Sequence, residues 1–72
     1  MVHGTVINAV ETRVGDLVAY RSLVRYELFG HLVIHGEVVL LARNGSVVVV
    51  YATVGADEQT VVEGILDRVN VA

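Results

Sequence analysis

Apolar and polar residues alternate along much of the chain, as they do in half-buried β-strands. The alternation is clearest between Leu17 and Phe29. Its even positions are apolar except for Ser22, whereas its odd positions mix arginine and glutamate with apolar residues. The same segment also fits helical spacing, so a helix is the alternative, but the period of two favours a strand.

Two further runs indicate strands. The first covers Val2–Val10 and is followed by a predicted turn at Thr12–Asp16. The second covers His31–Ala42 and contains Gly36. A glycine inside a strand often marks a bulge or a sharp bend, and we expect one of these at Gly36.

The pair Asn44-Gly45 is the clearest turn signal in the sequence. Asn-Gly between two β-branched runs is typical of a hairpin with a type I′ turn, because both residues tolerate positive φ. Val38–Ala42 and Val47–Val54 should therefore pair antiparallel. Within the second of these, Val47–Tyr51 shows no alternation, which predicts a strand covered on both faces.

The last segment has a different period. Its apolar residues recur on one side of a helix, and they are Val61, Val62, Ile65, Leu66 and Val69. Asp57 could cap this helix, or Thr60 and Glu63 could form a capping box. A turn followed by a short closing strand is the alternative for residues 57–69.

These elements predict a single small β-rich domain over residues 1–72, of the mainly β (α+β) class. We expect an antiparallel meander or a small SH3-like barrel of three to five strands. The C-terminal helix should pack across one face of the sheet.

The composition indicates more apolar surface than a chain of this size can bury. Hydrophobic residues make up 54% of the 72 residues, and 18 of the residues are valine. A chain of this size buries only about 60% of the surface that it exposes when unfolded. Either the fold closes on itself with both sheet faces shielded, or a second copy or another protein covers the surplus apolar surface. Homo-oligomerisation is the expectation. The residues predicted to be left over for such an interface are Leu17, Leu23, Phe29, Val2 and Val6.

Charge and cysteine content exclude several classes. The net charge of −3 argues against general binding to nucleic acid through phosphates. The absence of cysteine excludes disulfide scaffolds and Cys-ligated zinc modules. The longest uncharged stretch, Asn44–Ala56, is shorter than the ~20 residues that a membrane helix needs. With no targeting segment visible at the N-terminus, a cytoplasmic protein without membrane contact is expected.

Candidate chemistry is sparse. His31 and His35 would share one face of a helix, but along a strand they lie about 13 Å apart, too far for one ion. We therefore expect no metal site and no cofactor. Ser22 and Ser46 have no adjacent histidine and carboxylate arrangement, and the seven glycines are scattered. No catalytic residue is assigned, and a small enzyme ranks third among the functions considered.

Arginine and tyrosine accompany each other on the predicted strand at Leu17–Phe29. An Arg-plus-aromatic strand can bind single-stranded nucleic acid by stacking and phosphate contacts. The candidate binding residues are Arg21, Arg25, Tyr20, Tyr26 and Tyr51. The interpretation that we favour is simpler: the arginines form the solvated side of a strand, and the tyrosines belong to the core.

One stretch resembles a known class of fold. Val14–Arg21, with the sequence VGDLVAYR, resembles the opening strand of SH3-like and Tudor-like small barrels. Gly36–Val39 and Ser46–Thr53 resemble the next two strands, and residues 61–69 resemble the closing turn and final strand. The resemblance covers residues 13–70. It implies a binding module with no catalytic residues, in which Tyr20, Tyr26, Phe29 and Tyr51 would supply an aromatic cage.

The function that these observations favour is that of a small, non-enzymatic, self-associating interaction or assembly protein. An SH3-like or Tudor-like adaptor that binds nucleic acid or the transcription machinery is the alternative.

Overall fold

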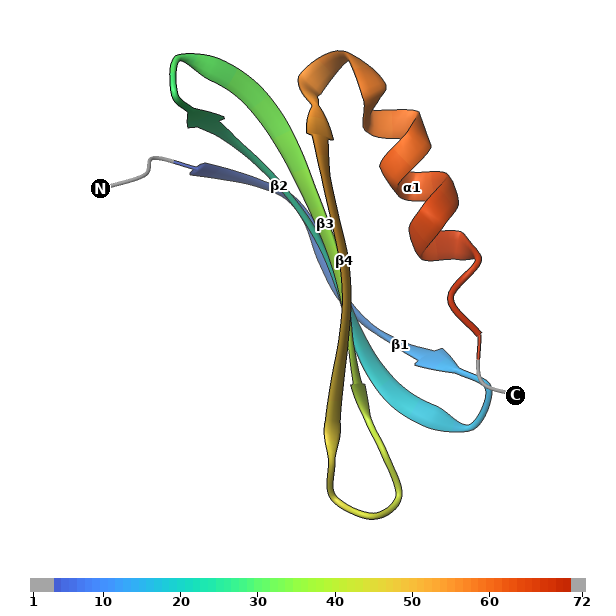
Figure 1. Cartoon of the computed structure of the whole chain (residues 1–72). Coiled ribbons are helices and arrows are strands. Elements are labelled where there is room, and N and C mark those ends of the chain that lie inside the picture. Colours follow the sequence, from blue (N-terminus) through green and yellow to red (C-terminus); the bar gives the residue numbers. More distant parts are fainter. Residues whose placement is uncertain (1–3, 71–72) are drawn as a thin grey trace.

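The chain forms one four-stranded antiparallel sheet with a single helix on one side (Figure 1). The computed structural model describes residues 4–70. Its elements are β1 (Gly4–Val14), β2 (Leu17–Leu28), β3 (His31–Leu41), β4 (Val47–Gly55), the short 3₁₀ helix η1 (Ala56–Glu58) and α1 (Gln59–Asp67).

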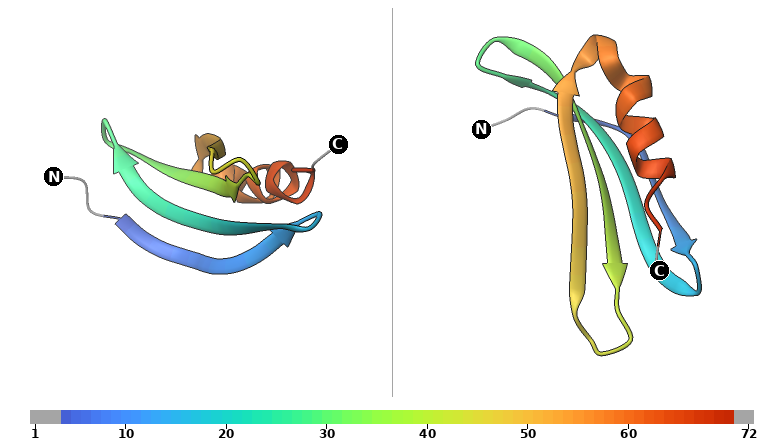
Figure 2. Two further views of the ribbon diagram at one scale, coloured as in Figure 1. Left: turned by 90° about the horizontal axis from the view of Figure 1, so that it is seen from below. Right: turned by 45° about the vertical axis from the view of Figure 1, so that its right-hand side comes forward.

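The strands follow one another in the sheet in the order β1-β2-β3-β4. The meander with a C-terminal helix, predicted from the periodicity, is confirmed. The sheet is long, twisted and open, and it does not close into the alternative SH3-like barrel (Figure 2). β1 and β4 are consequently the two edge strands.

The β2–β3 and β3–β4 turns have different backbone conformations. At the β2–β3 turn, Phe29 and Gly30 have φ of 50° and 78°, so both central residues are left-handed as in a type I′ turn. At Asn44-Gly45 the predicted hairpin is confirmed, but the predicted turn type is wrong. Gly45 has a φ of 88° and Asn44 does not have a positive φ. Asn44 instead accepts a hydrogen bond from the Ser46 amide through its side-chain oxygen, at 3.0 Å.

Gly36 allows the helix to approach the sheet. A Cβ built on Gly36 would lie 2.3 Å from Val62 Cγ1 and 2.9 Å from Leu66 Cδ1. β3 keeps a continuous register with both neighbours through Gly36, so the predicted bulge there is wrong. The sheet is instead irregular in β1, between Val6 and Asn8.

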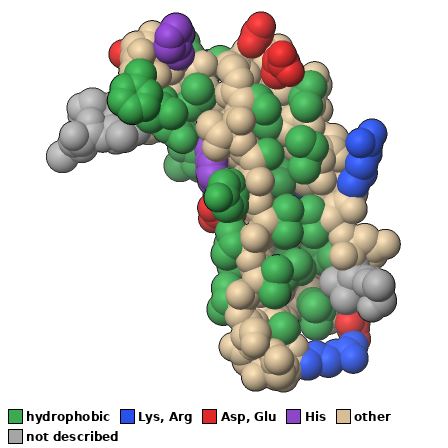
Figure 3. Space-filling view, in the orientation of Figure 1, with side chains coloured by type: hydrophobic (Ala, Val, Ile, Leu, Met, Phe, Trp, Pro, Cys, Tyr) green, Lys and Arg blue, Asp and Glu red, His purple; other side chains and the backbone are tan. Residues whose placement is uncertain are grey.

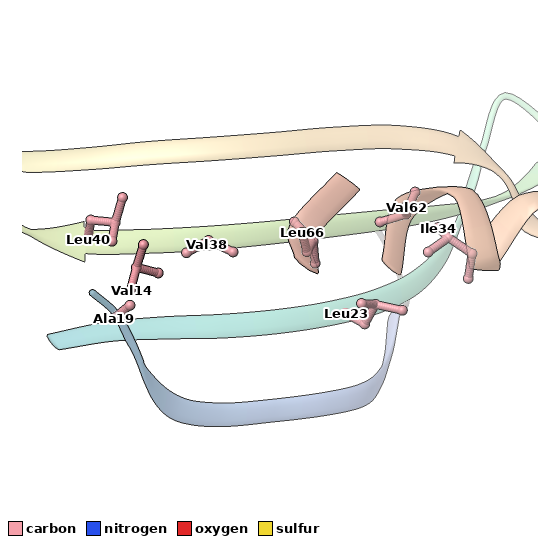
Figure 4. Packing of buried hydrophobic residues seen from close by; sticks show 8 residues of the cluster. All are labelled: Val14, Ala19, Leu23, Ile34, Val38, Leu40, Val62 and Leu66. Atoms are coloured by element: carbon pink, nitrogen blue, oxygen red, sulfur yellow. The ribbon is translucent and has the colours of Figure 1, made fainter. Parts of the chain in front are cut away.

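The core lies between α1 and the side of the sheet that it covers (Figure 4). Its buried members come from every element except β4 and η1; they are Val14, Ala19, Leu23, Ile34, Val38, Leu40, Val62 and Leu66. On β2 the buried residues are the odd ones, next to Arg21 and Arg25. The interpretation that placed the tyrosines in the core is therefore wrong. Tyr20, Tyr26 and Tyr51 all lie on the side away from α1, and Tyr20 is 47% and Tyr51 66% exposed.

The predicted helix is confirmed, but its predicted start is not. α1 begins at Gln59, and its N-cap, Glu58, makes no side-chain capping hydrogen bond. Asp57 lies within η1, and Thr60 lies inside the helix, so neither forms the predicted cap. The helix is held instead by the burial of Val62 and Leu66.

The valine run of β4 is also not covered on both faces as predicted. Val47, Val48 and Val49 are all exposed, because β4 is an edge strand and the helix lies over its other end. Among residues 4–70, β3 is the only strand that pairs with this run, and α1 packs over the later residues of β4.

We predict that Gly36→Ala lowers the free energy of unfolding by about 1–3 kcal/mol, since the added methyl group would overlap Val62 and Leu66. Gly64→Ala is the matched control. A Cβ at Gly64 meets nothing within 4 Å, and alanine favours a helix by up to about 1 kcal/mol over glycine. Urea unfolding at fixed protein concentration measures both; equal stability of the two variants would contradict this role of Gly36.

Candidate functional site: the open face of the sheet

One face of the sheet has no covering layer among the described residues. It is the side opposite α1, and we call it the open face. The cross-strand register and the alternation of side chains place its apolar residues. They are Val6, Val18, Tyr20, Val24, Tyr26, Leu28, Val33, Val39, Leu41, Val47, Val49 and Tyr51.

Several large side chains on the open face are strongly exposed, while others on the inner strands are half-buried. Tyr51 is 66%, Val6 63% and Val47 58% exposed. They come from both edge strands, so the apolar surface reaches both edges of the sheet, although Glu11 and Arg13 interrupt it at one end of β1. Single exposed apolar residues are ordinary on protein surfaces, but a face-wide apolar surface is typical of an interaction site.

Three polar side chains and a tyrosine form a connected cluster on the β3–β4 part of this face. His35 Nδ1 lies 2.8 Å from Thr53 Oγ1, across the β3–β4 pair. His35 Nε2 lies 3.1 Å from Glu37 Oε1, two residues along the same strand. The Tyr51 ring stacks on the imidazole with centroids 5.5 Å apart and planes at 28°. Both ring nitrogens are therefore engaged, which holds the imidazole in one orientation.

The Thr53 hydroxyl, the His35 imidazole and the Glu37 carboxylate are connected in the order found in enzymes that activate a hydroxyl nucleophile through histidine. Such an enzyme also needs a cleft that holds the acyl group and donors for the oxyanion. A surface hollow of about 210 Å³ is lined by Glu11, Thr12, Arg13 and Val18, at the β1–β2 end of the sheet. Its lining includes none of the cluster residues. The evident effect of the cluster is to satisfy its own polar groups within an apolar face.

The structure separates the residues that the sequence grouped as an interface. Val6 lies on the open face of β1. Leu17 is half-buried on the helix side, and Phe29 is 93% exposed at the tip of the β2–β3 turn. Leu23 is 3% exposed in the core beneath α1, so it is not part of any surface. Val2 lies outside the described residues.

The candidate binding residues are likewise divided between the two sides of the sheet. Tyr20, Tyr26 and Tyr51 lie on the open face, whereas Arg21 and Arg25 lie on the helix side. Arg21 forms an ion pair with Asp67 at the end of α1. The tyrosines also come from different cross-strand rows of the sheet. A surface that combines arginine charge with aromatic stacking is therefore not assembled by these five residues.

The histidines occupy separate places on β3. His31 is exposed at the first residue of the strand, and His35 is held in the cluster. Residues 4–70 contain no group of three or more His, Cys, Asp or Glu side chains that could hold a metal ion. Over the same residues, no helix has the length and hydrophobicity to cross a membrane.

Sequence reasoning missed the cluster and most of the open face. The spacing His35-x-Glu37 places two polar side chains on the same side of a strand, and this could have been read from the sequence. Their contact with Thr53 depends on the β3–β4 register. In comparisons with protein-family models, curated proteins and solved structures, nothing matched the chain.

The geometry of the cluster predicts the tautomer of His35. A carboxylate only accepts hydrogen bonds, so the neutral ring must carry its proton on Nε2 and donate to Glu37. Nδ1 then accepts from the Thr53 hydroxyl. Long-range ¹H–¹⁵N NMR should show the Nε2–H form of His35, and Glu37→Ala should produce a mixture of tautomers. A dominant Nδ1–H form in the unsubstituted protein would contradict the arrangement.

Proposed function

We propose that this protein is a small, non-enzymatic assembly protein whose open face binds a second copy of the same chain. The observation that carries the proposal is the apolar surface that spans all four strands without a covering layer in the described residues. A twofold-related copy is the commonest way to cover such a face, because the same patch then serves both partners.

The pattern along β2 supports burial of this face. Its even positions, from Val18 to Leu28, are apolar except Ser22, while the helix side of the same strand carries Arg21, Arg25 and Glu27. The more polar side of β2 thus faces α1, and its more apolar side faces outward. A strand with this pattern is expected to have its apolar side covered in the assembled protein.

The size of the open face supports the same conclusion. Four strands about 4.8 Å apart, each about nine residues long at about 3.3 Å per residue, give an area on the order of 600 Å². Stable interfaces typically bury about 600–1,000 Å² per partner. The face therefore reaches the lower end of the range for a dimer, and its area is comparable with the upper end for the largest apolar patch on a typical monomer, about 300–600 Å².

The polar cluster does not oppose this burial. His35 is hydrogen-bonded to both Glu37 and Thr53. A second copy can therefore cover these side chains while the polar atoms in the two bonds keep their partners. A satisfied polar group within an apolar interface can also disfavour shifted alignments of the two copies.

Charge placement supports assembly over nucleic-acid binding. The net charge is −3, and two of the five arginines are paired: Arg21 with Asp67, and Arg43 with Asp16. Tyrosines that could stack on bases lie on the side opposite to Arg21 and Arg25. The adaptor function implied by the resemblance to SH3-like and Tudor-like barrels therefore has no specific site in its favour.

We expect the purified protein to be larger than its 7.8 kDa monomer in size-exclusion chromatography with light scattering. Tyr20→Glu should raise the dissociation constant at least about tenfold, because it places a charge in the contact. Val6→Glu should act in the same direction from the edge of the face.

Val10→Glu is the matched control for Val6→Glu. Both residues are exposed on β1, but the irregularity between Val6 and Asn8 places them on opposite sides of the sheet. Val10→Glu should leave the mass unchanged, and circular dichroism should show that all variants fold. A folded monomer at every concentration, or equal effects of Val6→Glu and Val10→Glu, would contradict the proposal.

We also expect no salt-sensitive binding to random duplex DNA in a low-salt gel shift, since phosphate contacts require clustered free cations. Micromolar binding that Arg21→Ala with Arg25→Ala abolishes would favour the adaptor function instead.

A further inference from the structure

The two edge strands differ in how they are protected against pairing with another chain. β1 is interrupted between Val6 and Asn8 and carries Glu11 and Arg13. Bulges and charges of this kind are the usual protection of edge strands. β4 has neither: its nine residues, VVVVYATVG, include no charge and no proline, and its register with β3 is unbroken.

The first half of β4 also lies beyond the reach of the helix. Val62 and Leu66 of α1 pack over Gly36, whose partner on β4 is Ala52. Val48, on the helix side but nearer the β3–β4 hairpin, is still 46% exposed. In Figure 3, where β4 faces the reader, hydrophobic side chains continue from the helix down to that hairpin. The segment Val47–Tyr51 is thus an open edge with exposed apolar side chains on both faces.

We propose that Val47–Tyr51 is a second self-association surface, to which β4 of another copy adds as an antiparallel strand. The two four-stranded sheets then form one continuous eight-stranded sheet. A twofold axis through the middle of the segment places Val49 opposite Val49 of the second copy and Val47 opposite its Tyr51.

The side chains of the segment suit this self-pairing. Aromatic residues opposite β-branched residues stabilise antiparallel pairs, and each copy would supply two such contacts through Val47 and Tyr51. The segment contains no charged side chain, so the two copies do not repel each other. Its outward N–H and C=O groups would find partners that no described segment provides.

The occupant is a second copy rather than an unrelated strand because the segment is self-complementary about Val49. With the axis at Val49, Tyr51 pairs with Val47, the first residue of β4 in the added copy, which limits the paired stretch to this length. The edge contact is independent of the open face, because strand addition joins two sheets side by side whereas the open face pairs them face to face. Together the two surfaces would allow assemblies larger than a dimer.

Disulfide crosslinking tests the edge directly, since the chain contains no cysteine. In the proposed pair, the two Val49 Cα atoms lie about 4.5–5.5 Å apart, within the range that a disulfide spans. Val49→Cys should therefore form a covalent dimer rapidly with oxidised glutathione. Val39→Cys is the control, because Val39 lies beside Val49 on the same face. In the proposed pair, the β4 strands of both copies separate the two Val39 residues, which are therefore about 15 Å apart.

A charge on the edge provides the second test. Val48→Lys, introduced into the Val49→Cys protein, should slow crosslinking at least about tenfold, because charge on an edge opposes strand addition. Val10→Lys is its matched control: Val10 and Val48 are each 46% exposed, and both lie on the helix side, on opposite edges of the sheet. This control should leave crosslinking unchanged.

The outcomes separate the edge from the open face. Crosslinking of Val49→Cys that persists with Tyr20→Glu, but is lost with Val48→Lys, supports the edge contact. Equal crosslinking of Val49→Cys and Val39→Cys, or equal effects of Val48→Lys and Val10→Lys, overturns it and leaves the open face to explain any oligomer. In the unsubstituted protein, the Val47–Tyr51 amides should exchange hydrogen more slowly as the protein concentration rises. Exchange that does not change with concentration overturns the proposal without relying on a variant.

Discussion

The contact between α1 and Gly36 is the interaction on which the rest of the fold depends. The helix is only nine residues long, and its two buried side chains, Val62 and Leu66, meet the sheet where β3 has no side chain. Because this approach is so close, the residues around Gly36 on the same side become the core. The position of one glycine therefore decides which side of the sheet is buried.

A single short helix can cover only one side of a four-stranded sheet. The opposite side keeps its valines and tyrosines at the surface, and the far half of β4 lies beyond the end of the helix. These two features have one cause: the chain has more apolar strand than covering layer. The association that we propose, through the open face and through Val47–Tyr51, would complete the burial that the helix begins.

Local signals predicted the elements well. The alternation in β2, the Asn44-Gly45 hairpin and the helical period of residues 61–69 depend on neighbours in the sequence, and each of these elements is present. Predictions that required a choice between faces were less successful. The sequence pattern places Tyr20 in the core and Leu23 at a surface, yet in the structure Tyr20 is exposed and Leu23 is buried. Periodicity shows that two faces exist, but it does not identify the one that a distant helix covers.

The sequence by itself determined the strands, their antiparallel order and the excess of apolar surface, because these follow from side-chain period, turn residues and composition. Only the tertiary structure decided that the sheet stays open, that β4 lies at its edge, and that His35, Glu37 and Thr53 meet. Each of these depends on cross-strand register or on helix packing between residues far apart in the chain. The physical reason is that a strand's two faces are equivalent until another layer packs on one of them, and here Gly36 selects the face.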